Sequence, residues 1–336
     1  MAASSFRPLP KGIYTPLPTF FTATEELDLA AFASHVKFTA VAGTIPVVAG
    51  SAGEAAHLSP TERTTLIQTA RRTLDSCGLN HVPIVAGVGA LSTWETIQLA
   101  GLAKEAGADY GMVIPPGYYA GALQANGNEA LRKFFIDVAK ASPLPIVVYN
   151  FPGVSGGIDL DSDLIIDVIK ASPNVVGVKL TCASVGKLTR INAIVSSKEF
   201  KEKYPRKDPE VGFRIIDGYI DILLPSIASG AAGAISGLPN LVPRTCARLW
   251  ELASSIPGTV EYKEAQHLQN RIALADGFLQ KIGFAGMKML LHKRFGYSPL
   301  PRRPLLPSRE ELGDKWIGNP LLVDLIEEEE RLASIS

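Results

Sequence analysis

Eight short apolar runs rich in β-branched residues recur along the chain, and amphipathic helical segments lie between them. Successive runs are about 25 to 40 residues apart, which leaves room for one crossover helix in each interval. This rhythm is typical of a (β/α)8 TIM barrel, the α/β fold in which eight parallel strands close into a cylinder. The runs are IYTPL from Ile13, IPVVAG from Ile45, PIVAGV from Pro83, YGMVIP from Tyr110, PIVVYN from Pro145, VVGVKL from Val175, FRIIDG from Phe213 and AGAISG from Ala232.

Capping signals place two of the intervening helices. The segments SPTE at Ser59–Glu62 and STWE at Ser92–Glu95 both have a serine followed three residues later by glutamate, as in a capping box. We expect the barrel to cover residues 12–280 as a catalytic domain. Residues 281–336 follow the eighth strand and are expected to form an appended C-terminal helical region.

Two charged segments are interpreted as structural. The stretch SSKEFKEKYPRKDPE, between the sixth and seventh strands, predicts an exposed helix and loop because it is charged and rich in turn residues. The acidic run Glu327–Glu330 predicts a solvated helix face.

The charge balance and residue usage favour a small-molecule partner. The 336 residues carry 33 Lys and Arg against 33 Asp and Glu, so no net field attracts nucleic acid or a membrane surface. The apolar runs are short of a membrane span, and the first residues lack the apolar core of a secretory signal. Three widely spaced cysteines suit a reducing cytosol, so a cytoplasmic location is expected. Five scattered histidines form no ligand motif, so we expect no metal and no cofactor.

The segment NVVGVKLT, residues 174–181, predicts a buried strand with a lysine near its end. Strict alternation would put Gly177 and Lys179 on one face, with open space beneath the lysine. A desolvated lysine has a larger neutral fraction, which Schiff-base chemistry requires. The structural alternative is a lysine that extends to water or pairs with a carboxylate.

Residues suited to chemistry gather at the ends of the predicted strands, where barrel enzymes place their sites. Alternation puts Tyr149 on the face of the fifth strand that shares the barrel mouth with Lys179. The strand ends and following turns are Gly50–Glu54, Pro115–Tyr119, Tyr149-Asn150, Lys179, Asp217-Gly218 and Ser236-Gly237.

The turn GSAGE, from Gly50 to Glu54, allows two interpretations. It could be an ordinary tight turn whose glycines serve its backbone conformation. Alternatively, the backbone around Gly50, Ala52 and Gly53 could direct N–H groups at a substrate carboxylate, with the Ser51 hydroxyl beside them.

Other small and aromatic residues at the rim also have structural explanations. Tyr118 and Tyr119 could be aromatic residues of a subunit interface, an interpretation favoured for at least one of them. The segment SGAAGAISG is interpreted as small residues that allow close packing in preference to a phosphate site.

Four motifs in order resemble those of the dihydrodipicolinate synthase and N-acetylneuraminate lyase family of class I aldolases. They are GSAGE for the family's G-[ST]-[TSN]-G-E turn, YNFPG for its Y-N-x-P segment, GVKLT for its lysine strand and PPGYY for its paired tyrosines. The resemblance covers roughly residues 12–306 and implies the (β/α)8 barrel already expected.

The resemblance also implies roles for individual residues. A pyruvate-type 2-oxo acid would bind as an imine on Lys179, and Tyr149 would relay protons. Ser51 would link Tyr149 to a second tyrosine, Tyr119, which a neighbouring subunit contributes in the family. Ile235 matches a residue whose backbone carbonyl faces the site. A homotetramer built as a dimer of dimers follows from the same comparison.

Three departures from the family pattern bear on the substrate. Ala52 replaces the second hydroxyl of the carboxylate turn, which leaves backbone N–H groups and Ser51 to hold the anion. Gly117 adds a residue before the tyrosine pair, so either Tyr118 or Tyr119 could take the relay position. Val154 stands where the synthases carry an arginine for a second carboxylate, which argues against the lysine-pathway reaction.

These observations predict a carbon–carbon lyase that cleaves or forms a 2-oxo acid adduct through a lysine imine. The candidate substrates are 2-keto-3-deoxy sugar acids and 4-hydroxy-2-oxoglutarate. Alternatives with the same imine are a dehydratase and a dihydrodipicolinate-synthase-type condensation. A non-catalytic sugar-acid-binding barrel and a phosphate-dependent isomerase are alternatives of other classes. A sensor would not need a tyrosine beside the lysine, and an isomerase should carry a phosphate loop after the last two strands.

Overall fold

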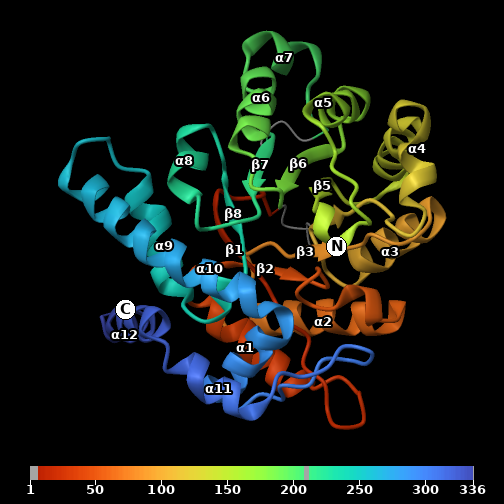
Figure 1. Ribbon diagram of the computed structural model, residues 1–336. Coiled ribbons are helices and arrows are strands. Elements are labelled where there is room, and N and C mark those ends of the chain that lie inside the picture. The colour runs from red at the N-terminus through yellow and green to blue at the C-terminus, as the bar shows by residue number, and fades with distance from the viewer. Residues whose placement is uncertain (1–6, 208–211, 336) are drawn as a thin grey trace.

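The computed structural model describes residues 7–207 and 212–335, and its central feature is a closed barrel of eight parallel strands (Figure 1). Each strand pairs with its neighbours in the sequence, and β8 closes the cylinder against β1. The prediction of a (β/α)8 TIM barrel is confirmed. The strands are β1 (Gly12–Pro16), β2 (Ile45–Val48), β3 (Val85–Gly87), β4 (Tyr110–Val113), β5 (Ile146–Asn150), β6 (Val175–Leu180), β7 (Arg214–Asp217) and β8 (Gly233–Ile235).

Helices surround the barrel, and a helical region is appended at its C-terminal end, as predicted (Figure 1). In that region α12 packs on α9 and α10, and α11 packs on α10. The helices are α1 (Leu29–Ala40), α2 (Pro60–Ser76), α3 (Thr93–Glu105), α4 (Ala120–Ala141), α5 (Ser162–Ala171), α6 (Val185–Val195), α7 (Lys198–Lys203), α8 (Leu223–Ala228), α9 (Pro243–Ala253), α10 (Val260–Phe295), α11 (Glu310–Ile317) and α12 (Pro320–Ser334).

The two faces of the sheet contribute to two separate apolar clusters. One cluster fills the barrel interior, and the larger one lies between the strands and the surrounding helices. Because the interior is packed with side chains, a ligand can enter only at an end of the barrel. The interior cluster consists of Leu9, Tyr14, Ile45, Val47, Val85, Tyr110, Met112, Val147, Tyr149, Val176, Ile216 and Ile235.

The expectation about Gly177 is wrong. The pairing of β5 with β6 is irregular between Ile146 and Val147, and Val176 packs inside the barrel while Val175 packs outside it. A Cβ atom on Gly177 would lie 2.9 Å from the carbonyl oxygen of Arg214, so the glycine allows close packing against β7 and does not border open space. Strict alternation failed here because a bulge shifts the facing of the residues before it.

The small residues of the segment SGAAGAISG, which contains β8, allow close packing, as predicted. Gly233 has a φ of +145°, and a Cβ atom there would lie 1.8 Å from the carbonyl oxygen of Gly12. Only glycine allows β8 to approach β1 this closely and close the barrel.

The predicted capping box at Ser59 is complete. The Ser59 side chain accepts a hydrogen bond from the Glu62 backbone, and the Glu62 carboxylate accepts one from the Ser59 backbone. At the second site, the Ser92 hydroxyl accepts from the Glu95 backbone. Of the predicted excursion after β6, α7 forms its helix, and residues 208–211 lie outside the described residues.

The prediction of a fully solvated acidic face in α12 is wrong for Glu329. This side chain is buried, and its carboxylate accepts hydrogen bonds from the backbone of Arg244 and from the backbone and hydroxyl of Thr245. These donors lie in the first turn of α9, where backbone N–H groups have no partner within the helix. Glu329 therefore joins α12 to the start of α9.

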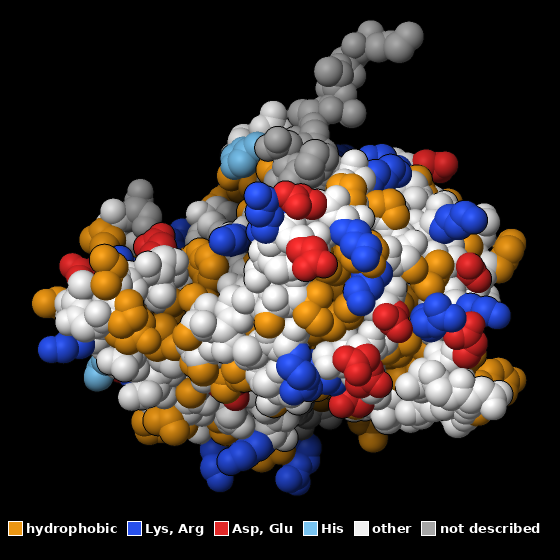
Figure 2. Space-filling model, turned by 90° about the horizontal axis from the view of Figure 1, so that it is seen from above, with side chains coloured by type: hydrophobic (Ala, Val, Ile, Leu, Met, Phe, Trp, Pro, Cys, Tyr) orange, Lys and Arg blue, Asp and Glu red, His pale blue; other side chains and the backbone are white. Residues whose placement is uncertain are grey.

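Charges of both signs are mixed on the surface. On the face shown in Figure 2, Lys and Arg side chains lie among Asp and Glu side chains, in keeping with the balanced totals. Across the described ranges, no helix is both long and apolar enough to span a membrane.

Candidate active site

Lys179 and Tyr149 meet at the barrel mouth, as the alternation of β5 predicted. They are register partners on adjacent strands, and the Lys179 Nζ atom lies 4.1 Å from the centre of the Tyr149 ring. Only 5% of Lys179 and 3% of Tyr149 is exposed. A buried amine that lies against the face of a tyrosine ring is positioned for covalent chemistry, with a proton-transfer group beside it.

Ser51 lies on the other side of the same tyrosine. Its hydroxyl is 3.4 Å from the Tyr149 hydroxyl, a long hydrogen bond in which either group can donate. Tyr149 lies on β5 and Lys179 on β6, and Ser51 lies in the turn after β2, so the three residues meet at the carboxyl ends of these strands.

The turn that carries Ser51 is tight and internally hydrogen-bonded. The backbone N–H groups of Gly53 and Ala55 both donate to the Gly50 carbonyl, and that of Glu54 donates to the Ser51 carbonyl. Among the hydrogen bonds of the described residues, the N–H groups of Ser51 and Ala52 have no acceptor. These two amides and the Ser51 hydroxyl are therefore the donors that the turn can offer an anion.

Glycines around the turn allow its close packing against β1 and β3. A Cβ atom on Gly53 would lie 2.9 Å from the Leu17 carbonyl oxygen, and one on Gly87 only 1.9 Å from that of Ala49. The Thr19 hydroxyl also donates to the Gly53 carbonyl at 2.7 Å. Of the predicted turn residues, Gly53 thus allows close packing of the backbone, whereas a Cβ atom on Gly50 would make only ordinary contacts.

A cavity of about 480 Å³ opens beside these residues. Gly50, Ser51 and Tyr149 form part of its wall, together with Val154 and Phe284. Lys179 does not line this cavity itself. Its amine contacts the ring of Tyr149, which is part of the cavity wall. The space is large enough for a small-molecule ligand.

The remaining predicted residues lie in two places. Ile235 ends β8 and is buried in the barrel interior, 1% exposed. Tyr118 and Tyr119 are 77% and 69% exposed, and their rings contact each other edge to face at 5.0 Å. Within one chain the structure does not bring either tyrosine to Ser51, for which the described hydrogen bonds give only Tyr149 as a side-chain partner.

Two polar side chains at strand ends were not assigned a role in the site from the sequence, although Ser236 was noted by its position. Thr181, directly after β6, and Ser236, directly after β8, are 6% and 4% exposed, and neither hydroxyl has a hydrogen-bond partner among the described residues. A buried hydroxyl without a partner costs free energy that a bound polar ligand can recover. Their positions at strand ends were visible in the sequence, but their missing partners were not.

Asp217, at the end of β7, accepts hydrogen bonds from residues of its own loop. The Ser226 hydroxyl donates to its carboxylate at 2.5 Å, and the Tyr219 backbone donates at 3.0 Å. Burial raises the pKa of Asp217 to about 6, and the hydrogen bond from Ser226 opposes this.

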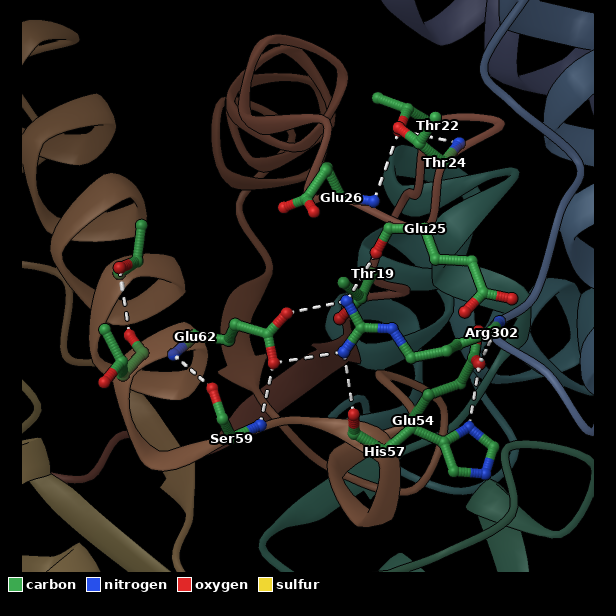
Figure 3. A network of polar contacts seen from close by, with 12 residues as sticks. Thr19, Thr22, Thr24, Glu25, Glu26, Glu54, His57, Ser59, Glu62 and Arg302 are labelled. Atoms are coloured by element: carbon green, nitrogen blue, oxygen red, sulfur yellow. Dashed lines mark hydrogen bonds and ion pairs between the residues drawn. The ribbon is translucent and has the colours of Figure 1, made fainter.

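A polar network, also missed by the sequence interpretation, lies behind the turn (Figure 3). Arg302 donates to both carboxylate oxygens of Glu62, at 2.6 and 3.0 Å, and to the backbone carbonyl of His57 at 2.8 Å. His57 in turn contacts the Glu54 carboxylate. Glu54 belongs to the quoted GSAGE motif and Glu62 to the quoted SPTE segment, but neither motif indicated Arg302 as a partner.

The chain is similar in sequence and fold to known proteins. Residues 9–316 match the Dihydrodipicolinate synthetase family. A relative from Emericella nidulans, named as a probable mitochondrial 4-hydroxy-2-oxoglutarate aldolase, is 41% identical over 91% of this chain and 92% of its own length. An L-threo-3-deoxy-hexylosonate aldolase from Aspergillus niger is 38% identical over 89% and 91%. The crystal structure of a dihydrodipicolinate synthase family protein from Coccidioides immitis superimposes with a TM-score of 0.79 at 34% identity, over 97% of this chain and 99% of that one.

The chain belongs to the dihydrodipicolinate synthetase family, which confirms the resemblance found in its motifs. Because the named relatives are aldolases, the predicted enzyme class, a carbon–carbon lyase of the aldolase type, is confirmed as well.

Proposed function

We propose that Lys179 forms an imine with a 2-oxo acid and that the enzyme cleaves or forms the bond between pyruvate and an aldehyde. The observation that carries this proposal is the buried contact of the Lys179 amine with Tyr149, which itself reaches Ser51. In the first step the neutral amine attacks the C2 carbonyl. Water then leaves, and an iminium ion joins Nζ to C2.

Cleavage follows from the electron demand of the iminium ion. The C3–C4 bond breaks, its electron pair moves into a C2–C3 double bond, and an enamine forms. As the aldehyde is released, the Tyr149 oxygen accepts the proton of the C4 hydroxyl and passes its own proton to the Ser51 hydroxyl, which in turn releases a proton toward the cavity. Protonation at C3 and hydrolysis of the imine then release pyruvate and free Lys179.

The carboxylate of the 2-oxo acid is assigned to the turn after β2. The amides of Ser51 and Ala52 and the Ser51 hydroxyl support this assignment because they are donors without another acceptor in their own turn. Gly53 allows the close packing of this turn, Gly50 is assigned to the backbone beside the carboxylate, and the Ile235 carbonyl is assigned to the inner wall.

The first substrate class to test is the 2-keto-3-deoxy sugar acids. Val154, an apolar cavity residue, offers no charge to a second carboxylate, which favours a sugar chain that carries neutral hydroxyl groups. The relative from Emericella nidulans makes 4-hydroxy-2-oxoglutarate the second substrate to test.

A panel of these acids, with pyruvate release followed by a coupled lactate dehydrogenase assay, tests the proposal. Release of stoichiometric pyruvate and aldehyde from at least one acid is expected. A dehydrated 2-oxo product with no pyruvate would instead identify a dehydratase acting through the same imine. Absence of turnover with the whole panel would contradict the proposal.

We further propose that the enzyme works as a homotetramer of tight dimers. Tyr118 and Tyr119 are exposed to an extent unusual for tyrosines, and the cavity beside Ser51 is open. A second copy that inserts Tyr119, or Tyr118, into this cavity would complete a proton path from Tyr149 through Ser51.

The proposed location is the cytosol, because the three cysteines are free and suit a reducing compartment. The name of the relative from Emericella nidulans places that protein in mitochondria. Imaging of the full chain with a C-terminal fluorescent tag tests the location. A diffuse cytosolic signal supports the proposal, and a mitochondrial signal contradicts it.

A further inference from the structure

Glu54 is the last residue of the GSAGE turn, and its carboxylate is buried and fully engaged. Oε1 lies 2.5 Å from the Nζ atom of Lys288, and both side chains are 2% exposed. Oε2 accepts a hydrogen bond from the backbone of Arg302 at 2.9 Å and lies 3.3 Å from Nδ1 of His57. The partners Lys288 and Arg302 lie more than 200 positions further along the chain.

Lys288 connects this carboxylate to the C-terminal region. It lies on α10, its ammonium also donates to the Leu300 carbonyl at 2.8 Å, and it is 4.7 Å from the centre of the Phe21 ring. Burial lowers the pKa of Lys288, and the charge of Glu54 opposes this. A buried charge of this kind is stable only with its partner in place.

Arg302 supports the opposite side of the same turn. Its guanidinium stacks 4.4 Å from the centre of the Phe21 ring and donates to the carbonyls of His57 and Glu25 as well as to Glu62 (Figure 3). Glu62 is also the residue that completes the capping box at the start of α2. The C-terminal segment thus contacts the connection from β2 to α2 at Glu54 and His57 and the first turn of α2 at Glu62.

The backbone of the turn explains why it needs such support. Ala49 and Glu54, at its two ends, both have a φ of 54°, a left-handed conformation that residues with a side chain rarely adopt. Backbone of this kind persists only when the surrounding structure holds it. Between these two residues lie the free amides of Ser51 and Ala52.

We propose that Glu54, Lys288 and Arg302 are positioning residues that hold the 50–54 turn in the shape that binds the substrate carboxylate. This inference rests on the proposed function, in which the turn receives that carboxylate. It makes the C-terminal extension a working part of the active site. Glu54 does not carry protons in this scheme, because Lys288 and Arg302 occupy both of its oxygens.

The experiment measures imine formation at Lys179 by borohydride trapping, followed by mass spectrometry, at increasing concentrations of two carbonyl compounds. Pyruvate carries the carboxylate, and acetaldehyde does not. In Lys288→Met the half-saturating pyruvate concentration should rise at least about 10-fold, as expected for loss of charge-assisted contacts. The half-saturating acetaldehyde concentration should stay within about 2-fold of its wild-type value, because acetaldehyde has no carboxylate to bind the turn.

A control variant and a milder variant accompany this one. Lys293→Met removes an ion pair between α10 and Asp314 of α11, away from the turn, and should leave both compounds unchanged. Arg302→Gln keeps the backbone contact with Glu54 and loses the guanidinium contacts, so it should raise the half-saturating pyruvate concentration by a smaller factor. It provides the test if Lys288→Met does not fold.

The outcomes separate the two proposals. Unchanged pyruvate labelling in folded Lys288→Met and Arg302→Gln would overturn the positioning role and leave the proposed function standing. Equal shifts for pyruvate and acetaldehyde would also overturn it, because they would indicate general loosening of the fold. If pyruvate fails to label the wild-type enzyme at all, the proposed function and this inference both fail.

Discussion

Tyr149 contacts the two other proposed catalytic groups of its own chain, with Lys179 against its ring and Ser51 beside its hydroxyl. If it relays protons, its hydroxyl matters for rate more than for binding. Tyr149→Phe should therefore lower kcat by about 10²- to 10⁴-fold, the usual effect of losing one positioned proton-transfer group. Pyruvate affinity should change little, because the turn around Ser51 is untouched.

Steady-state kinetics and isothermal titration with pyruvate measure these two quantities. Tyr204→Phe, which removes a hydroxyl from a loop after α7, is the matched control and should behave like wild type. Near-normal turnover in Tyr149→Phe would make Tyr149 a packing residue.

Val154 gives a second prediction for a single residue. It is 45% exposed and lines the cavity, but it offers no positive charge. Aspartate semialdehyde, which brings its own carboxylate, should therefore be a poor partner for bound pyruvate compared with neutral hydroxyaldehydes. A coupled dihydrodipicolinate synthase assay measures this, and efficient synthase activity would contradict it.

Within single elements, α10 carries a buried carboxylate that the proposed mechanism does not use. Asp276 is 3% exposed and accepts a hydrogen bond from Gln280, which also donates to Asp221. Burial raises the pKa of Asp276 to about 7, and the nearby charge of Asp221 adds to this. In the folded protein Asp276 keeps its proton up to a pH of about 7, whereas in the unfolded chain it loses the proton near its ordinary pKa of about 4. The contribution of Asp276 to the free energy of unfolding is therefore lost as the pH rises from about 4 to 7.

Asp276→Asn removes this dependence, because the amide stays neutral and can still accept from Gln280. Thermal unfolding of the variant and wild type at pH 5 and pH 8 measures the difference. The gain in unfolding free energy should be larger at pH 8 than at pH 5, by up to about 3 kcal/mol. An equal gain at both pH values would show that Asp276 is not the titrating group.

The strands and helix starts could be predicted because their signals are local. An apolar run of β-branched residues or a serine three positions before a glutamate is visible within a few residues. Contacts between distant segments have no such signal. The bulge that moves Val176 inside the barrel, the contact of Glu329 with α9 and the pairing of Glu54 with Lys288 all depend on which elements meet.

The candidate site divides in the same way. The alternation along β5 predicted that Tyr149 faces Lys179, and the family motifs brought Ser51 to them. Thr181 and Ser236 were given no role, although Ser236 was noted at a strand end, because an unpaired hydroxyl is recognised only from its surroundings. The predicted boundary at residue 280 falls within α10, three residues before its non-helical Gly283. We propose that the barrel, residues 12–280, and the extension, residues 281–336, do not have separate functions, since Lys288 of the extension contacts Glu54 in the turn after β2.

For the whole molecule, the oligomer proposal predicts that active sites are shared between subunits. Lys179→Arg and Tyr119→Phe should each be nearly inactive as pure proteins. When the two variants are mixed in equal amounts and refolded together, about a quarter of all sites should contain both native residues across an interface. The mixture should therefore regain up to about a quarter of the wild-type activity. Light scattering gives the oligomeric state, and a fully active monomer would contradict the proposal.

The same mixing experiment identifies the tyrosine. If Tyr118→Phe is inactive and is rescued by Lys179→Arg, while Tyr119→Phe is active alone, then Tyr118 takes the relay position. If neither variant loses activity, the proton path through a second subunit is wrong.

The central claim is that Lys179 is the amine that forms the imine, and trapping with pyruvate and borohydride tests it most directly. The reductant converts the imine to a stable secondary amine, and peptide mass mapping locates the added mass. The account predicts loss of activity with one label per chain, on Lys179. It also predicts no label and no turnover in Lys179→Arg, because a guanidinium stays protonated and is not an amine nucleophile. A label on Lys281 or Lys288, or turnover that survives in Lys179→Arg, would contradict it.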